Sequence, residues 1–147
     1  MGSLSTKRAL VTGTSQGIGK ATVAALLQAG CDVAAHWHSG TEGPRDLESL
    51  AKAFGRRLFL LQADLTKEDE AAAMVARAVA DLGGLDVLVN NAGSLIARHP
   101  VTEIDERFWR DSIDLNLTSV LIVTRQATPA LAAAGASSIV NLSSLAG

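Results

Sequence analysis

The chain has 147 residues, of which 48% are apolar and 19% are charged, and its formal net charge is −2. This composition is typical of a globular domain and excludes an intrinsically disordered chain. The basic residues form no stripe, which argues against a nucleic-acid polymer as partner. We find no apolar run long enough to span a membrane and no secretory signal, so we expect a cytoplasmic protein without a membrane partner. The single cysteine, Cys31, excludes an internal disulfide and a cysteine-based zinc site, and no metal site is predicted.

Strand-like apolar runs alternate with helix-like amphipathic runs along the whole chain. The expected strands are residues 7–11, 32–37, 57–63, 85–89 and 138–142. The expected helices are residues 17–29 and 47–54, a third helix, and a long helical region, 105–134. The third helix is expected to begin at a capping box, Thr66-Lys67-Glu68-Asp69, and to end at Gly83. This alternation predicts an α/β fold, a doubly wound parallel sheet of the Rossmann type with five βα units.

We expect residues 1–147 to form a single domain, because no linker or internal repeat interrupts the alternation. The last expected strand is followed by no crossover helix, although a parallel strand is normally covered on both faces. Its residues Ile139, Val140 and Leu142 would then form an open apolar edge. We therefore expect the sequence to be truncated after strand five, with the C-terminal part of the fold missing.

The first strand runs into a glycine-rich turn, Gly13-x-x-x-Gly17-x-Gly19, and then directly into a helix. Glycine permits positive φ and close approach of a ligand to the main chain, and the free N–H groups of a helix N-terminus suit a phosphate. The spacing is neither the common Gly-x-Gly-x-x-Gly fingerprint nor a P-loop. Taken alone, the turn could equally be a tight strand-to-helix connection.

Polar residues follow all five expected strands at their carboxyl ends, where open parallel sheets bind their ligands. They are residues 12–19, residues 36–39, Asp64, residues 90–93 and residues 143–144. Because these ends meet at one edge of the sheet, they predict a nucleotide site in a single crevice.

In these motifs the chain resembles the N-terminal part of the short-chain dehydrogenase/reductase family. The matching motifs are Thr12-Gly13-x-x-x-Gly17-x-Gly19, Asp64-Leu65, Asn90-Asn91-Ala92-Gly93, Asp114-Leu115-Asn116-Leu117 and Asn141-Leu142-Ser143-Ser144. The resemblance implies a single dinucleotide-binding domain. The cofactor contacts that it implies come from Thr12, Gly13, Ser15, Gln16, Gly17, Ile18, Gly19, Asp64, Leu65, Asn90, Asn91, Ala92 and Gly93.

The resemblance also implies hydride transfer between a nicotinamide cofactor and a carbonyl or alcohol group of a small-molecule substrate. Ser144 would hydrogen-bond the substrate oxygen, and Asn116 would hold a water in a proton relay. The family's general acid is the tyrosine of a Tyr-x-x-x-Lys motif that lies a short distance beyond the serine. This chain has no tyrosine, so we predict that it is inactive alone. A non-catalytic nucleotide-binding module is the alternative function if 147 residues is the natural length.

Each of these residues also has a purely structural interpretation. Thr12 could cap the turn, Asp64 could cap the following helix, and Asn90 could satisfy buried backbone groups. Asn116 could be a surface or kink residue, and the two serines after the last strand could be turn residues. The resemblance further implies a homo-oligomer, because family members usually pair through the helix after strand four and the helix after strand five.

The end of the second strand decides between NAD and NADP. An acidic side chain there binds the ribose 2′-hydroxyl and repels a 2′-phosphate. Trp37 occupies the expected position, and Asp32 lies at the wrong end of the strand. His38 and Ser39 could receive a phosphate, so we predict NADP. NAD is the alternative, because Gln16 stands where many NADP-binding relatives have arginine. Either of the two histidines, His36 and His38, could instead be a solvated loop residue.

Overall fold

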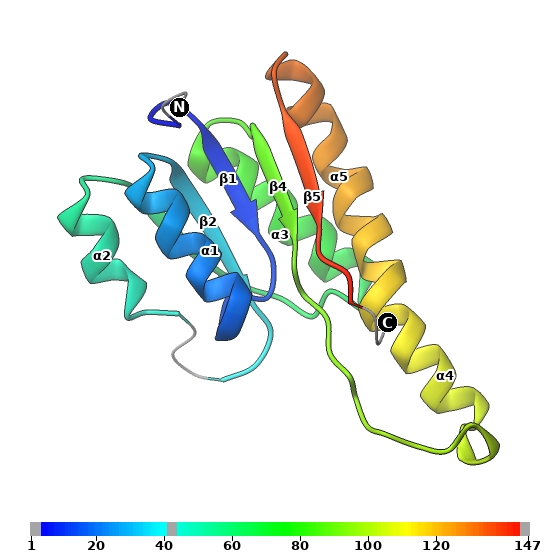
Figure 1. Cartoon of the computed structure of the whole chain (residues 1–147). Helices are drawn as coiled ribbons and strands as arrows, with labels where there is room; N and C mark the ends of the chain where they lie inside the picture. Colours follow the sequence, from blue (N-terminus) through cyan, green and yellow to red (C-terminus); the bar gives the residue numbers. More distant parts are fainter. Residues whose placement is uncertain (1–3, 41–43, 145–147) are drawn as a thin grey trace.

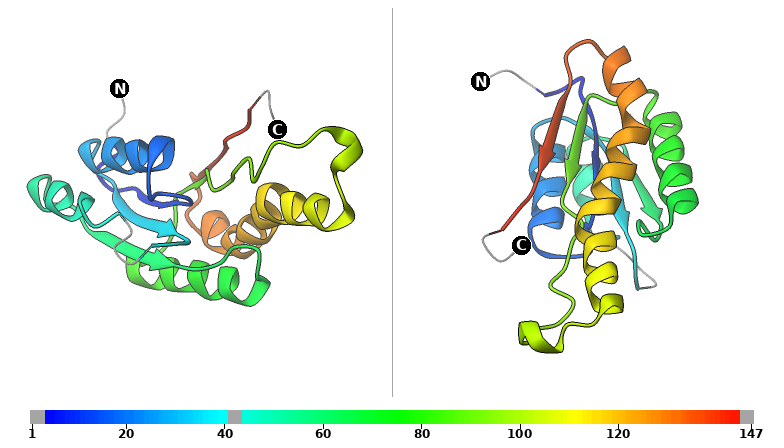
Figure 2. Two further views of the ribbon diagram at one scale, coloured as in Figure 1. Left: turned by 90° about the horizontal axis from the view of Figure 1, so that it is seen from below. Right: turned by 90° about the vertical axis from the view of Figure 1, so that its right-hand side faces the viewer.

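A computed structural model describes residues 4–40 and 44–144, in which one parallel sheet lies between two layers of helices (Figures 1 and 2). The strands are β1 (Arg8–Val11), β2 (Asp32–Trp37), β3 (Leu58–Gln62), β4 (Val87–Asn90) and β5 (Ser138–Asn141). Their order in the sheet is β3-β2-β1-β4-β5, so the winding direction reverses between β1 and β4. This arrangement confirms the doubly wound α/β fold and puts the switch point beside the glycine-rich turn.

The α-helices of the described residues are α1 (Gly17–Gln28), α2 (Leu47–Ala53), α3 (Glu68–Leu82), α4 (Glu106–Ile113) and α5 (Ser119–Ala133). The pair α1 and α2 lies on one face, and α3 packs against α5 on the other (Figure 2). In the described residues, no helix has both the length and the apolar character needed to cross a lipid bilayer.

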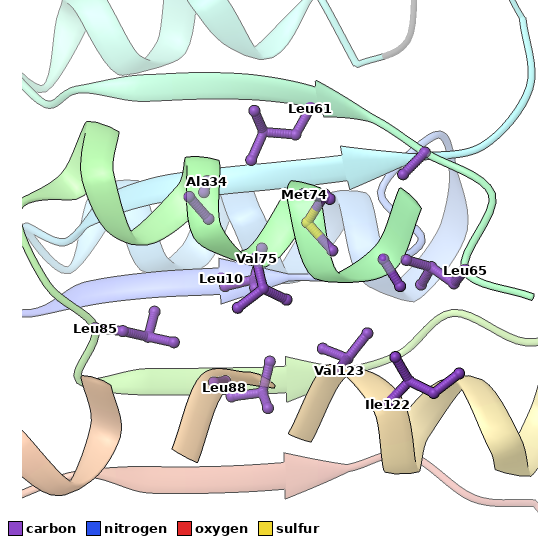
Figure 3. Close-up of a cluster of buried hydrophobic side chains, with 14 of the residues drawn as sticks. Leu10, Ala34, Leu61, Leu65, Met74, Val75, Leu85, Leu88, Ile122 and Val123 are labelled. Atoms are coloured by element: carbon purple, nitrogen blue, oxygen red, sulfur yellow. The ribbon is translucent and has the colours of Figure 1, made fainter. Parts of the chain in front are cut away.

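Successive residues of β1 enter opposite cores, as expected of a buried parallel strand. Leu10 packs into the larger core beneath α3 and α5, among residues such as Met74 and Ile122 (Figure 3). Its neighbours Ala9 and Val11 enter the core beneath α1 and α2. The strand β1 is therefore packed on both faces, which fixes the position of the turn that follows it.

The predicted capping box at the start of α3 is wrong. The Asp64 carboxylate oxygen Oδ1 accepts hydrogen bonds from the Thr66 N–H at 3.0 Å and from the Thr66 hydroxyl at 2.6 Å. The hydroxyl is therefore unavailable to the helix, which begins at Glu68 with Lys67 at its N-cap and no side-chain cap. The other end of α3 is as predicted, because Gly83 closes it with φ of 76°.

The long helical region is interrupted between α4 and α5 by a π-helical segment, Asp114–Thr118. The Ser119 N–H donates to the Asp114 carbonyl oxygen, five residues back, in place of the usual four. A 3₁₀ turn, Val101–Glu103, precedes α4.

At the far edge of the sheet, Ile139 and Val140 of β5 are 45% and 48% exposed, which confirms the predicted open apolar edge.

Two aspartates lock the amino ends of the strands. Asp86, just before β4, accepts hydrogen bonds from the N–H of Arg8 at 2.9 Å and from its Nε at 2.7 Å. Asp32, at the start of β2, accepts the same pair of bonds from Arg57, at 2.9 and 2.8 Å. Each carboxylate therefore accepts hydrogen bonds from both the backbone N–H and the guanidinium Nε of an arginine at the start of a neighbouring strand.

The two arginines then converge on the C-terminus of α3. Arg8 donates to the Gly83 carbonyl at 2.6 Å, and Arg57 donates to the carbonyls of Asp81 and Leu82 at 3.2 and 3.1 Å. Helix C-terminal carbonyls carry partial negative charge and lack helical partners, so they favour cations. These two aspartate–arginine pairs thus join four strands, β1 to β4, to the C-terminus of α3, at the end of the sheet remote from the glycine turn.

Asp86→Asn should lower the free energy of unfolding by about 2 kcal/mol, since it weakens charge-assisted hydrogen bonds at a buried position. Burial raises the pKa of Asp86, but the hydrogen bonds and charge of Arg8, with the charge of Lys7, outweigh it and hold the pKa below its ordinary value of 3.8. The stabilisation is therefore present above that value and is lost as the pH falls through the lower folded-state pKa.

Urea unfolding of both proteins at neutral and at acid pH measures this effect, and the difference between them should shrink on acidification. Glu106→Gln is the control, because Glu106 and Arg110 form an exposed pair within α4. Its loss should be under about 0.5 kcal/mol at every pH. Equal losses for the two variants would contradict the role given to Asp86.

Candidate functional site

The parallel sheet brings the predicted site residues to its carboxyl edge, because every strand points the same way (Figure 1). The glycine turn follows β1, His38 and Ser39 follow β2, and Asp64 follows β3. The Asn91-Ala92-Gly93 stretch follows β4, and Ser144 follows β5. Contacts between these segments show which side chains are already used within the protein.

Thr12 and Asn91 lock the turn after β1 to the loop after β4. The Thr12 side chain is buried, and its hydroxyl oxygen accepts hydrogen bonds from the N–H groups of Asn91 and Ala92, both at 3.0 Å. In return, the Asn91 side-chain amide donates to the carbonyls of Thr12 and Gly13 at 2.9 and 2.8 Å. The Thr12 hydroxyl is therefore bonded within the protein, to the loop after β4 and not to the turn that the structural interpretation of this residue assigned to it.

The glycines of the turn have different roles. Gly13 has φ of 70°, and a Cβ there would lie 2.7 Å from the Ala92 Cα. A Cβ on Gly19 would overlap the Gly13 carbonyl oxygen and the Asn91 side-chain amide. Both glycines thus permit segments of the protein to pack closely. Gly17 also has positive φ, 57°, but a Cβ there would meet open space.

The N-terminus of α1 has the features of an anion cradle. Gln16, at the N-cap, is extended and makes no side-chain cap hydrogen bond, and the first turn of the helix has no acidic residue. Ser15, Gln16, Gly17 and Ile18 are exposed. Helix N-terminal N–H groups without a side-chain cap are available to a phosphate, so the residues present fit a dinucleotide.

His36 lies inside β2 and not in a solvated loop, which was one interpretation of the sequence. Its side chain is 1% exposed, so it is no solvated loop residue. Its Nδ1 accepts a hydrogen bond from the Gly13 N–H at 3.2 Å, and its Nε2 lies 3.0 Å from the Ala63 carbonyl oxygen. Burial lowers the pKa of His36, while the hydrogen bond to Ala63 opposes that shift and the charge of His38 adds to it. A polar residue inside an otherwise apolar strand, next to a glycine turn, is the signal that could have found it.

Asp64 lies at the rim of a hollow of about 360 Å³. The side chains around the hollow are those of His38, Gln62, Ala63, Asp64, Lys67 and Glu70. The hydrogen bond from the Thr66 hydroxyl is the main reason why the pKa of Asp64 lies below its ordinary value. Its other carboxylate oxygen is 3.9 Å from the His38 Nε2 and 3.8 Å from the Lys67 Nζ. The side chain of Leu65, by contrast, is 4% exposed and packs in the core (Figure 3).

Asn90 links three elements beneath the site. Its buried side-chain amide donates to the Thr124 hydroxyl of α5 at 3.0 Å and to the Asn141 side-chain oxygen of β5 at 2.8 Å. These partners are side chains and not the backbone groups that the sequence analysis considered. Asn90 thus fixes the strand that leads to Ser144, whose side chain is exposed.

Asn116 lies in the π-helical segment and binds the loop after β4. Its Oδ1 accepts a hydrogen bond from the Ser94 N–H at 3.0 Å, and its Nδ2 donates to the carbonyls of Ser94 and Ser112 at 3.1 and 3.0 Å. A Cβ on Gly93 would lie 2.7 Å from the same Oδ1, so glycine is needed for this approach. Among the described residues, no three potential metal-ligating side chains gather at this edge or elsewhere.

Comparison with known proteins gives consistent results. Residues 7–147 match the family model described as short chain dehydrogenase. The chain is 39% identical over 139 residues to a cis-4-hydroxycyclohexanecarboxylate dehydrogenase of Sinomonas cyclohexanicum, covering 95% of this chain and 55% of that protein.

Two solved structures are similar along most of the chain. The NADH-dependent reductase A1-R′ complexed with NAD has a TM-score of 0.88 and 36% identity, covering 95% of this chain and 60% of that one. A short chain dehydrogenase from Burkholderia cenocepacia in complex with NADP has a TM-score of 0.82 and 32% identity, covering 88% and 53%. The chain therefore spans a little over half the length of the relatives it matches.

Thr12→Val should lower the free energy of unfolding by about 2–4 kcal/mol, because it leaves the N–H groups of Asn91 and Ala92 without an acceptor. Thr12→Ser keeps the hydroxyl and should cost about 1 kcal/mol for the lost methyl group. Chemical unfolding, with amide hydrogen exchange at Asn91 and Ala92, measures both. Equal destabilisation by the two variants would show that the methyl group, and not the hydroxyl, holds the two loops together.

Proposed function

The chain belongs to the short-chain dehydrogenase family, and on that basis we propose that it forms the nucleotide site of an oxidoreductase. The reaction is hydride transfer between a nicotinamide cofactor, NADP(H), and a carbonyl or alcohol group of a small molecule. The observation that carries the proposal is the uncapped N-terminus of α1 at the switch point of the sheet, bordered by the loops that carry Asp64 and Asn91.

The phosphates would lie at the start of α1. Ser15, Gln16, Gly17 and Ile18 are exposed there, and the turn that carries them is fixed from behind by the Thr12–Asn91 contacts. A fixed set of N–H donors loses little entropy when it binds an anion. Gly13, Gly19 and Ala92 would contribute by shaping this turn and the adjoining loop.

The adenine end would lie toward Asp64 and the hollow beside His38. Thr66 holds one carboxylate oxygen of Asp64, so the orientation of the other is set before a ligand binds. Because the Leu65 side chain is buried, this residue would act through its backbone. Gly93 and Asn90 complete the opposite wall, the first as an exposed residue and the second as a buried support.

NADP is the proposed cofactor, with NAD as the alternative. The strand β2 ends at Trp37, and the carboxylate of Asp32 is bound to Arg57 at the opposite end of the strand. His38 and Ser39 are exposed where a 2′-phosphate would lie, with no acidic residue in the sequence between Trp37 and Gly40. The similar structures contain NAD in one case and NADP in another, so they do not decide the choice.

When bound, the nicotinamide supplies or accepts the hydride. Ser144 would donate a hydrogen bond to the substrate oxygen, which favours the negative charge that develops on that oxygen. Asn116 would hold a water through its Oδ1. An amide oxygen accepts two hydrogen bonds, and the Ser94 N–H supplies only one of them, so the water would donate the other. The sequence contains no tyrosine, so no residue of this chain matches the family's general acid.

A self-associating protein is also part of the proposal. Exposed apolar side chains follow one another along α4, the π-helical segment and α5. Trp109, Leu117 and Leu121 are 59%, 61% and 62% exposed. Such residues are typical of surfaces that another chain covers, and a second copy of the chain is the proposed partner.

The 147-residue chain should bind NADPH but should not reduce carbonyl compounds above background, because general acid assistance is worth about 10²–10⁴-fold. Absorbance of NADPH with a panel of ketones and aldehydes measures turnover, and calorimetry measures binding. Turnover equal to that of a complete relative would show that the acid lies within these residues. Failure to bind any nicotinamide nucleotide would contradict the proposed function as a whole.

A chimera in which the remaining part of the Sinomonas relative follows residue 147 should restore turnover. In it, Ser144→Ala should lower kcat by about 10²–10³-fold with unchanged NADPH affinity. Ser143→Ala is the matched control and should change kcat by less than about threefold. If the two substitutions had equal effects, the role given to Ser144 would be wrong. An inactive chimera that binds NADPH would favour the non-catalytic nucleotide-binding module.

Trp37→Asp should shift the preference from NADPH toward NADH, because the new carboxylate repels the 2′-phosphate and accepts a hydrogen bond from a 2′-hydroxyl. Trp37→Asn removes the indole without adding charge and separates the two effects. The dissociation constants for NADPH and NADH measure the outcome. The ratio should move at least tenfold further for aspartate than for asparagine, about 1.4 kcal/mol. A wild-type chain that binds NADH more tightly would make NAD the cofactor.

A further inference from the structure

We propose that His36 is a positioning residue of the nucleotide site, which holds the glycine turn after β1 and the loop after β3 in one arrangement as its neutral Nε2–H tautomer. The inference rests on the proposed nucleotide site. His36 belongs to none of the motifs on which the family resemblance was based, and its contacts supply the argument.

Four hydrogen bonds meet at His36, which lies near the carboxyl end of β2 between β1 and β3. On the ring, Nδ1 accepts from the Gly13 N–H at 3.2 Å, and Nε2 lies 3.0 Å from the Ala63 carbonyl oxygen. The His36 carbonyl oxygen accepts from the Thr14 N–H at 2.8 Å and from the Thr14 hydroxyl at 3.0 Å. One residue therefore binds the turn on one side and the Asp64-bearing loop on the other.

The partners of the ring determine its protonation state. Because an N–H approaches Nδ1, this nitrogen has to offer a lone pair, and because a carbonyl oxygen approaches Nε2, this nitrogen has to carry the proton. The other neutral tautomer would set two N–H groups against each other at Gly13 and two lone pairs against each other at Ala63. A doubly protonated ring would keep the Ala63 contact and lose the one to Gly13.

The contact with Gly13 matters because that residue has no freedom to move alone. Its carbonyl oxygen is bound by the Asn91 side chain and lies where a Cβ on Gly19 would collide with it. A displacement of the Gly13 N–H would therefore be passed to Asn91 and to the start of α1. Loss of the Nδ1 acceptor should loosen the phosphate end of the site while leaving Ala63 and Asp64 in place.

Acid should break the hydrogen bond from the Gly13 N–H to the His36 Nδ1, because a second proton would occupy that nitrogen. Burial lowers the pKa of His36 and the charge of His38, just after β2, lowers it further, so a second proton adds only below the ordinary histidine pKa. On the loop after β3, Asp64 has its carboxylate engaged by Thr66 and near Lys67, and Glu70 of α3 accepts the Asp64 N–H. On β1, Arg8 is bound to Asp86 at the opposite end of the sheet, and the glycine turn, residues 13–19, contains no ionisable side chain.

Two substitutions separate the two ring nitrogens. His36→Asn places an amide oxygen where Nδ1 lies, so it keeps the Gly13 acceptor and loses the Ala63 donor. His36→Gln places an amide nitrogen near Nε2, so it keeps the Ala63 donor and loses the Gly13 acceptor. With NADH and NADPH as probes in calorimetry, His36→Gln should weaken binding of both roughly tenfold, and His36→Asn by less than about threefold.

Two readouts distinguish positioning from a general loss of stability. The ¹⁵N shifts of the His36 ring in the chain without nucleotide should show Nδ1 unprotonated and Nε2 protonated. As the pH falls below the ordinary histidine pKa of 6.5, NADH affinity should fall in the wild type relative to His36→Asn, because a second proton removes the Nδ1 acceptor. His38 is present in both proteins, so its contribution cancels in this comparison.

The outcomes separate this inference from the proposed function. A wild-type chain that binds neither NADH nor NADPH overturns the proposed function, and this inference with it. If the wild type binds but His36→Gln and His36→Asn bind equally well, or the ring carries its proton on Nδ1, the inference alone is overturned. If circular dichroism shows that His36→Gln is unfolded, the ring shifts and the pH comparison with His36→Asn decide.

Discussion

Where the strands of a parallel sheet end, backbone N–H and carbonyl groups lose their ladder partners but stay buried beneath the helices. Leaving such a group unpaired costs about 1–3 kcal/mol, so the ends of the sheet have to be completed by side chains. At the amino end, Asp32 and Asp86 bind the first N–H of a neighbouring strand. At the carboxyl end, the side chains of Thr12 and His36 accept hydrogen bonds from N–H groups of the loop and turn that border the candidate site, and the Asn91 side chain donates to a carbonyl of the turn.

This constraint divides the motif residues into two groups. Thr12 and Asn90 are buried, and their side chains are already bonded within the protein, so they shape the site from behind. Residues such as Gln16 and His38 are exposed at the same edge and can meet a ligand. A motif that looks uniform in sequence therefore combines a scaffold and a binding surface, and substitutions in the two groups affect different measurements: stability and loop exchange in the first, nucleotide affinity in the second.

Local patterns in the sequence were enough for the fold and for the sheet edge at which the candidate site residues gather, because apolar periodicity and glycine stops depend on near neighbours. The hydrogen bonds of Asp86 with Arg8 and of Asp32 with Arg57 could not be predicted from such local patterns. Asp86 and Arg8 lie 78 positions apart, and they meet only because β1 and β4 are adjacent in a particular register. The capping box failed for a local reason: Asp64, two residues before Thr66, lies outside that pattern, and its carboxylate accepts the hydrogen bond of the Thr66 hydroxyl.

The places where local rules fail lie at the candidate site. A π-helical turn is less favourable than an α-helical one and persists where its surroundings favour it. Here Asn116 supplies that compensation, since its amide bonds both the N–H and the carbonyl of Ser94 and also the carbonyl of Ser112. The same bonds hold the loop after β4 against the helical layer. The buried ring of His36 is a second exception, a polar group in an apolar strand whose two nitrogens bind two loops. In both cases an unfavourable local choice is offset by contacts that fix segments around the candidate site, which is the arrangement expected where position matters more than stability.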